Sequence, residues 1–214
     1  MYKKIDLSTW ERADVFNYFI QQDRCVMSIT CDVDVTDFVA FCKERGLNFY
    51  ATLVCLVTQV VNRSEHFRLG YDEQGELVVW DQVNPYYTDF LKDTKTFITI
   101  ITPHSSDFQQ FYENVQRDRR HSIENRILRA EITMSNIFGI SSVPWISYSS
   151  VSFENYDQST SLTPVITWGK YALKEGRLKL PLSLQMHHAA CDGYDMAMFF
   201  LDVEHELKEF VEKQ

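Results

Sequence analysis

The apolar segment FYATLVCLVTQVV, residues 49–61, most limits what this chain can fold into. A helix needs about 20 apolar residues to cross a bilayer, so this segment is too short, and Thr and Gln interrupt it. We therefore predict a helix at 49–62 that is buried in the protein interior. Hydrophobic residues make up 45% of the chain and aromatic residues 14%, which is enough apolar material for a sizeable core.

Helical and extended patterns are grouped along the chain rather than strictly alternating. Ser8 and Glu11 resemble a capping box, which predicts a helix over 8–19. Thr36 is predicted to cap, and Gly46 to end, a helix over 36–46. The other predicted helices run from 105 to about 121 and from 192 or 193 to the C-terminus. Strands are predicted at 25–35, 96–102, 131–138 and 143–151, and hairpins at 66–81 and in the pair of strands 164–173 and 177–186.

This grouping indicates an α/β (α+β) fold, a two-layer sandwich in which helices pack on a mixed β-sheet. Gly and Pro are few, and they are scattered over the whole length. No repeat, low-complexity segment or linker interrupts the sequence. We therefore expect a single domain spanning residues 1–214.

The net charge of −9 argues against nucleic acid or an anionic membrane as a partner, because both require clustered Lys and Arg. The one basic cluster, at 117–129, has the pattern of an amphipathic helix end and is expected to be solvated. The polar N-terminal stretch lacks the apolar core of a signal peptide. Five cysteines without a CxxC pair favour reduced thiols, so we expect a cytoplasmic protein.

The stretch MHHAACDGY, residues 186–194, lies between the last predicted strand and the last predicted helix. On a strand, His187 and His188 point to opposite faces, and no HExxH motif or cysteine cluster adds ligands, so no metal is expected. No GxSxG elbow supplies a nucleophilic serine, and Cys191 is more often a packing residue than a nucleophile at such a turn. A histidine pair here can be purely structural. The chemical alternative is one histidine as a general base, because its ordinary pKa of about 6.5 suits removing a proton near neutral pH.

These residues resemble the HHxxxDG signature of the trimeric chloramphenicol acetyltransferases, which the catalytic domains of dihydrolipoamide acyltransferases share. The resemblance extends over essentially the whole chain, through the stretches IDLSTWERADVFNYF, GELVVWDQVNPYYTDFLKDTKTF, ISSVPWISYSS and TPVITWGKYALKEGRLKLPLSLQMHHAACDGY. The lipoyl and linker segments usual in the dihydrolipoamide acyltransferases are absent. We therefore expect an enzyme of the antibiotic-modifying type.

The resemblance implies an enzyme that acetylates the primary hydroxyl of chloramphenicol with acetyl-CoA, in a ternary complex, and so gives antibiotic resistance. His188 matches the general base, whose ring the family holds against its own backbone carbonyl. Ser141 matches the serine that stabilises the tetrahedral oxyanion, and Thr167 a threonine that reaches the intermediate through water. Asp192 and Arg12 match an ion pair that supports the site.

The resemblance also implies where the substrates bind and how the subunits assemble. Phe19, Met27, Phe97 and Phe153 fall at acceptor-pocket positions, and Tyr171 falls at a position near the adenine of CoA. No metal or further cofactor is implied. The family forms homotrimers with active sites between subunits, so we expect the catalytic histidine to face a pocket built largely by a neighbouring copy.

Several residues depart from the family pattern, and all of them concern the acceptor. Phe19 stands where a substrate-binding tyrosine is usual, and Tyr18 is one helix step of about 100° away. Met27 replaces a frequent phenylalanine, Gly139 a frequent asparagine, and Asn155 an apolar wall residue. Two alternatives therefore stay open: an acyltransferase of the same fold that acts on a different small hydroxyl, amine or thiol acceptor, or a non-catalytic trimer that binds a ligand.

Overall fold

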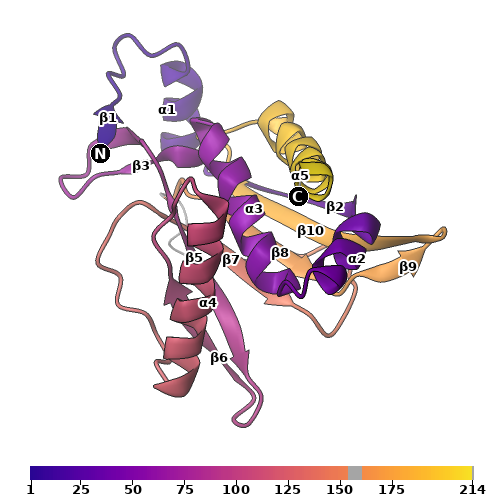
Figure 1. Cartoon of the computed structure of the whole chain (residues 1–214). Coiled ribbons are helices and arrows are strands. Elements are labelled where there is room, and N and C mark those ends of the chain that lie inside the picture. The colour runs from indigo at the N-terminus through magenta and orange to yellow at the C-terminus, as the bar shows by residue number, and fades with distance from the viewer. Residues whose placement is uncertain (154–160, 214) are drawn as a thin grey trace.

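The chain is built around a mixed seven-stranded sheet (Figure 1). The structure is a computed structural model that describes residues 1–153 and 161–213. Strand β7 runs parallel to its neighbours β5 and β8, and the other pairs are antiparallel. In spatial order the strands are β2 (Val26–Asp34), β10 (Arg177–His187), β8 (Val165–Gly169), β7 (Ile137–Val143), β5 (Asn84–Leu91) and β6 (Thr96–Ile101), and the short β9 (Ala172–Lys174) pairs with β10.

Helices form the second layer, as the sequence predicted (Figure 1). The predicted buried helix is α3, Phe49–Arg63, which is buried over nearly all of its length. It lies between α4 (Phe108–Glu124) and α5 (Gly193–Lys213), and α2 (Thr36–Glu44) packs against α5. Among the residues described, no helix is long and apolar enough to cross a membrane.

The two faces of the sheet differ in chemistry. Trp168 contacts Tyr50 of α3, with ring centroids 5.5 Å apart, which identifies its side of the sheet as the face toward the helices. Because side chains alternate along a strand, the next row of residues points to the opposite face. This row consists of directly paired hydroxyl side chains: Ser141, Thr167, Ser183 and Thr30.

A small second sheet holds the N-terminal part of the chain, in the order β1 (Tyr2–Lys4), β4 (Leu77–Trp80) and β3 (Leu69–Tyr71). Its last two strands belong to the predicted 66–81 hairpin. The helix predicted over 8–19 is wrong at its start, since α1 spans Ala13–Gln21. Ser8 does not cap it, because its hydroxyl and backbone N–H both bond to Asp6 Oδ1. Thr36 begins α2 without capping it, and its hydroxyl instead accepts from the N–H of Leu178.

The strands predicted at 131–138 and 143–151 are wrong in their bounds, because one strand, β7, covers 137–143. Pro144 follows it and has no N–H with which to continue the ladder. Strand β5 was not predicted from the residue pattern, in which Pro85 argues against a central strand. The other strands and hairpins, and the helices that became α2 to α5, are confirmed with small shifts of their ends, with two exceptions. The strand predicted at 164–173 is broken into β8 and β9, and the first residues of the predicted 66–81 hairpin form a 3-10 helix, η1 (His66–Arg68).

The sheet forks between β5 and β7. Their parallel ladder ends at Tyr87 and Ile140, beyond which β5 continues beside β6 and β7 continues beside β8. The hydroxyl of Tyr50 in α3 donates to the carbonyl of Thr88, the first residue of β5 beyond the split. Burial holds the pKa of Tyr50 far above its usual range, so this hydroxyl keeps its proton. The fork leaves an opening in the sheet that begins at Ser141.

The segment after β7 crosses the face of the sheet that the helices leave open. The N–H of Lys170 donates to the carbonyl of Ile146 at 2.7 Å, and the hydroxyl of Tyr148 donates to the carbonyl of Thr167 at 2.9 Å. Gly169 permits this close approach. A Cβ at that position would lie 2.8 Å from the Ile146 carbonyl oxygen and 2.8 Å from the Tyr148 ring.

Gly169→Ala is expected to destabilise the protein by about 1–3 kcal/mol, because the added methyl group overpacks against Ile146, Tyr148 and Pro181. Urea or thermal unfolding measures the change. Gly193→Ala is the control, since a Cβ there meets nothing within 4 Å. Equal stability of the two variants would mean that the segment moves away from β8 without cost.

Candidate active site

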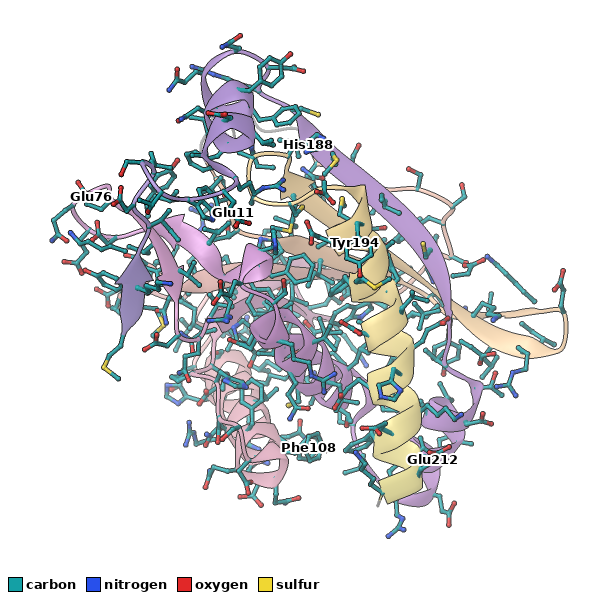
Figure 2. The ribbon with its side chains drawn as sticks, turned by 90° about the horizontal axis from the view of Figure 1, so that it is seen from above. Glu11, Glu76, Phe108, His188, Tyr194 and Glu212 are labelled. Carbon is teal, nitrogen blue, oxygen red and sulfur yellow. The ribbon has the colours of Figure 1, made fainter. Side chains whose placement is uncertain are left out.

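The turn after β10 carries His188 and holds its ring in one tautomer. The N–H of His188 donates to the carbonyl of Cys25 at 2.8 Å, and Nδ1 lies 3.0 Å from the carbonyl oxygen of Cys191. A carbonyl can only accept, so Nδ1 carries the proton and Nε2 keeps a free lone pair. The ring stacks on Phe19 of α1 with centroids 3.9 Å apart, at the end of the sheet nearest that helix (Figure 2). His188 can therefore accept a proton at Nε2.

The carbonyl that orients this ring is not the one that the family resemblance implied. The expected partner was the carbonyl of His188 itself. In the structure that oxygen accepts a hydrogen bond from Nη2 of Arg12 at 3.1 Å. The imidazole instead uses the carbonyl of Cys191, three residues on, and the consequence for Nε2 is the same.

His187 takes the opposite tautomer. Its Nδ1 accepts from the N–H of Ala189 at 3.1 Å, so its proton lies on Nε2, which is buried and has no partner among the described residues. Burial, together with the neighbouring His188, lowers the pKa of His187, which is therefore neutral near pH 7. Of the two histidines, only His188 offers a free Nε2.

Arg12 supports the turn through three contacts rather than one. Its Nη1 lies 3.3 Å from Asp192 Oδ2, while Nη2 and Nε donate to the carbonyls of His188 and Ala189 at 3.1 and 3.2 Å. The Asp192 side chain is 46% exposed, so the ion pair itself contributes at most about 1 kcal/mol. Partial burial would raise the pKa of Asp192, but hydrogen bonds from the N–H of Tyr194 and from Arg12 outweigh it and lower that pKa.

Two other chemistries find no support at this turn. Cys191 is fully buried, and burial together with the charge of Asp195 raises the pKa of its thiol to about 12, so almost no thiolate is present at neutral pH. Across the part of the chain that the structure describes, no cluster of three or more His, Cys, Asp or Glu residues is placed to hold a metal ion.

A second set of predicted residues lines a pocket of about 830 Å³ in the fork of the sheet. Ser141, Phe97 and Phe153 belong to its wall, together with Phe90 and Trp145. The last two rings meet edge to face with centroids 4.7 Å apart. Because Ser141 is the first residue of β7 beyond the fork, it lies where the opening begins.

The pocket is lined from both faces of the sheet, and the two sides differ. Tyr50 of α3 and Arg119 of α4 line the side toward the helices, where Arg119 pairs with Asp89 at 2.8 Å. Phe97 and Trp145 line the opposite side and are 60% and 57% exposed. The pocket therefore has one side with charged groups and one aromatic side.

Thr167 lies directly beside Ser141, in register across β7 and β8. Its hydroxyl oxygen is buried and lacks a hydrogen-bond partner within the described part of the chain. Buried hydroxyls normally have a partner, so this one is suited to a water or a ligand group.

The two sets of residues lie far apart within one chain. Ser141, Thr167 and Ser183 are paired across three strands, and His187 lies four residues beyond Ser183 on β10. With strands about 4.8 Å apart and a rise of about 3.3 Å per residue, the Cα atoms of Ser141 and His187 are about 16 Å apart. The pocket wall accordingly contains Ser141 without His188.

The other predicted binding residues divide between these places. Phe19 stacks on the histidine ring, and Met27 pairs with Met186 at the same end of β10. Phe97 and Phe153 lie at the fork instead. Tyr171 packs against Phe49 at the start of α3, with ring centroids 5.5 Å apart, and so belongs to the helix side.

Tyr50, Asp89 and Arg119 also line the pocket, and they were not predicted from the sequence. The one signal that could have found them is the charged Asp89 within the aromatic stretch YYTDFL. Of the departures noted in the sequence, Gly139 lies on β7 just before the fork. Asn155 lies outside the described residues.

The sequence matches the family described as chloramphenicol acetyltransferase over residues 1–204. A chloramphenicol acetyltransferase of Clostridium perfringens is 36% identical over 201 residues, covering 94% of this chain and 92% of the relative. One of Staphylococcus aureus is 36% identical over 204 residues, covering 95% and 94%.

Solved structures agree with the fold. A chloramphenicol acetyltransferase superposes with a TM-score of 0.84 at 25% identity, covering 97% of this chain and 100% of the other. A truncated catalytic core of the 2-oxoacid dehydrogenase multienzyme complex from Thermoplasma acidophilum has a TM-score of 0.68 at 17% identity, covering 97% and 99%, and shares the fold. The predicted fold class is confirmed.

Arg12→Met is expected to destabilise the protein by about 1–3 kcal/mol, because it leaves two carbonyls of the buried turn without a donor. Asp192→Asn is expected to destabilise the protein by at most about 1 kcal/mol, because Arg12 still donates to the carbonyls of His188 and Ala189. Urea unfolding at pH 7 compares the two. A larger loss for Asp192→Asn would contradict this assignment.

The same pair of measurements has a pH dependence. The pKa of Asp192 is lowered on folding, so its contribution is complete above the unfolded pKa of about 3.9 and is lost as the pH falls through the lower folded pKa. The stability of Asp192→Asn should therefore approach that of the wild type below about pH 4, whereas Arg12→Met should stay destabilised.

Proposed function

The chain belongs to the chloramphenicol acetyltransferase family, and we propose that it transfers the acetyl group of acetyl-CoA to the primary hydroxyl of chloramphenicol, which confers resistance to the antibiotic. Family membership makes it an acyltransferase. One observation carries the assignment of residues: the turn leaves Nε2 of His188 free, while Ser141 lies at an aromatic pocket.

His188 acts as the general base. Its Nε2 removes the proton of the acceptor hydroxyl while that oxygen attacks the thioester carbon of acetyl-CoA. The carbonyl oxygen becomes an oxyanion that accepts a hydrogen bond from Ser141, a contact that typically contributes about 10²–10³ in rate. The tetrahedral intermediate then collapses with cleavage of the C–S bond, and the imidazolium returns its proton to the CoA thiolate. Thr167, whose buried hydroxyl has no partner among the described residues, holds a water against the intermediate.

The active site is completed between subunits of a homotrimer. Within one chain the Cα atom of Ser141 lies about 16 Å from that of His187, the residue before the base, so the base and the serine are too far apart to act on one carbonyl group. A neighbouring copy that places its His188 turn against the fork would supply the missing base. That copy would also cover Phe97 and Trp145, whose exposure marks an interaction surface. A closed ring of three gives every copy the same contact.

Acetyl-CoA binds from the helix side of the fork and chloramphenicol from the other side. On the helix side, Arg119 brings positive charge to an anionic co-substrate, and Tyr171 presents a ring for the adenine. On the other side, Phe90, Phe97 and Trp145 offer ring faces and edges to a nitrophenyl group.

A more polar acceptor is the second candidate. Lys92 and Lys95 line the same pocket as the aromatic rings, in addition to the Asp89–Arg119 pair on the helix side. Cations in the wall favour acceptors that carry polar groups in matching places. A polar alcohol, an amine or a thiol would use the same base and the same oxyanion donor.

Purified protein is expected to release CoA thiol from acetyl-CoA when chloramphenicol is added, as a thiol reagent measures. His188→Ala should lower kcat by about 10²–10⁴ because no group replaces the base. Its circular dichroism should remain that of the wild type, whereas its Tm should fall because the buried Cys191 carbonyl loses its donor. The exposed His205→Ala variant is the control. Unchanged turnover in His188→Ala would refute the base. Thiol release only with another acceptor would favour the second candidate.

Mixed trimers test the shared site. Co-expressed His188→Ala and Ser141→Ala chains should recover roughly a quarter of wild-type activity, because a random ring of the two variants restores about one intact site in four. Each variant alone should be nearly inactive. A mixture as inactive as its parents would mean that the base and the serine of one site come from the same chain.

A further inference from the structure

The turn 187–192 is a buried stretch of backbone in which every carbonyl has a hydrogen-bond partner. Ala189, Ala190 and Cys191 are fully buried, so their carbonyls need donors from within the protein. Three of these carbonyls have donors within the turn and the following helix. The N–H of Ala190 donates to the carbonyl of His187, Nδ1 of His188 donates to that of Cys191, and the N–H of Met196 donates to that of Asp192. Arg12 donates to the carbonyls of residues 188 and 189. The carbonyl of Ala190 is the one that still requires a donor.

His66 completes this set from the middle of the chain. It begins η1, a 3-10 helix at His66–Arg68 that follows α3, and its Nδ1 lies 3.0 Å from the carbonyl oxygen of Ala190. The same nitrogen lies 3.5 Å from Oδ2 of Asp195, and that oxygen accepts the N–H of Asp192 at 2.9 Å. His66 thus contacts the turn directly at Ala190. It also contacts the carboxylate of Asp195, which holds the end of the turn at Asp192.

We propose that His66 is a positioning residue for the catalytic base, an inference that rests on the role of His188 proposed above. Arg12 holds the first half of the turn, and His66 holds the second half. The carbonyl that orients the His188 ring belongs to Cys191, the residue after Ala190. If the Ala190 carbonyl loses its donor, that peptide can rotate, and the Cys191 carbonyl moves with it. The His188 ring then loses its single orientation.

This role is tested by substitutions of His66 that either keep or remove the donor to the Ala190 carbonyl. In Asn the amide nitrogen stands two bonds from Cβ, as Nδ1 does in His, whereas in Gln it stands one bond further away. His66→Asn should therefore recover most of the rate, within about threefold of the wild type. His66→Gln and His66→Ala should lower kcat by about 10–100-fold, since misplacing a catalytic group by about 1 Å costs up to about 10². KM for both substrates should change less than about twofold, because no substrate contact is lost.

A readout that needs no turnover separates this proposal from the proposed function. Imidazole nitrogen shifts of His188, assigned by comparison with His188→Ala, report which ring nitrogen carries the proton. We expect the Nδ1–H form in the wild type and in His66→Asn, and a mixture of both forms in His66→Gln and His66→Ala. The exposed His205→Ala variant is the control and should match the wild type in both assays.

The outcomes are distinct. If all three His66 variants keep the wild-type kcat and the wild-type His188 spectrum, the proposal is overturned. If kcat falls in step with Tm across the three, including His66→Asn, His66 only stabilises the fold and the proposal is likewise overturned. If the wild type does not acetylate chloramphenicol, the proposed acceptor fails, and the His188 spectra still decide whether His66 orients that ring.

Discussion

Buried backbone carbonyls need donors wherever a β-ladder stops, and this requirement shapes both parts of the site. At the end of β10, a turn whose central residues Ala189–Cys191 are fully buried finds its donors in Arg12, in His66 and in the His188 ring itself. At the fork of the sheet, the carbonyl of Thr88 finds its donor in the hydroxyl of Tyr50. The hydrogen bonds that allow these irregular places to be buried also orient the groups that carry chemistry.

The fork and the turn give one chain two incomplete sites. The fork supplies a pocket with Ser141 and aromatic rings, and the turn supplies a histidine with a free Nε2. Strand pairing separates them, because Ser141 is in register with Ser183, well before the end of β10. In the proposed assembly, the turn of one copy would meet the fork of another, and this contact would cover Phe97 and Trp145, which are exposed on the free chain.

The charged residues that line the pocket differ in sign from the net charge of the molecule. The chain carries a net charge of −9, which would repel an anionic co-substrate at long range. The pocket in the fork is lined by more cations than anions, with Lys92, Lys95 and Arg119 against Asp89. Since Arg119 is paired with Asp89 and also bonds to Asn48 and Gln116, it forms a fixed part of the wall. The charge of the pocket wall is therefore opposite in sign to the net charge of the chain.

Local sequence patterns were sufficient to predict the buried helix α3, the hairpins, and a histidine at a strand end that is followed by a carboxylate. These follow from apolar runs, strand alternation and glycine turns, which act over a few residues. Arg12 is 180 residues from Asp192, and only the family resemblance assigned it to the site. Local rules also failed in places, since Ser8 and Thr36 make other hydrogen bonds than the caps predicted for them. The three-dimensional structure was needed to show where the sheet forks, that Cys191 holds the ring of His188, and that the histidine and the serine of one chain lie apart. Those outcomes depend on contacts between residues distant in sequence, about which local patterns carry no information.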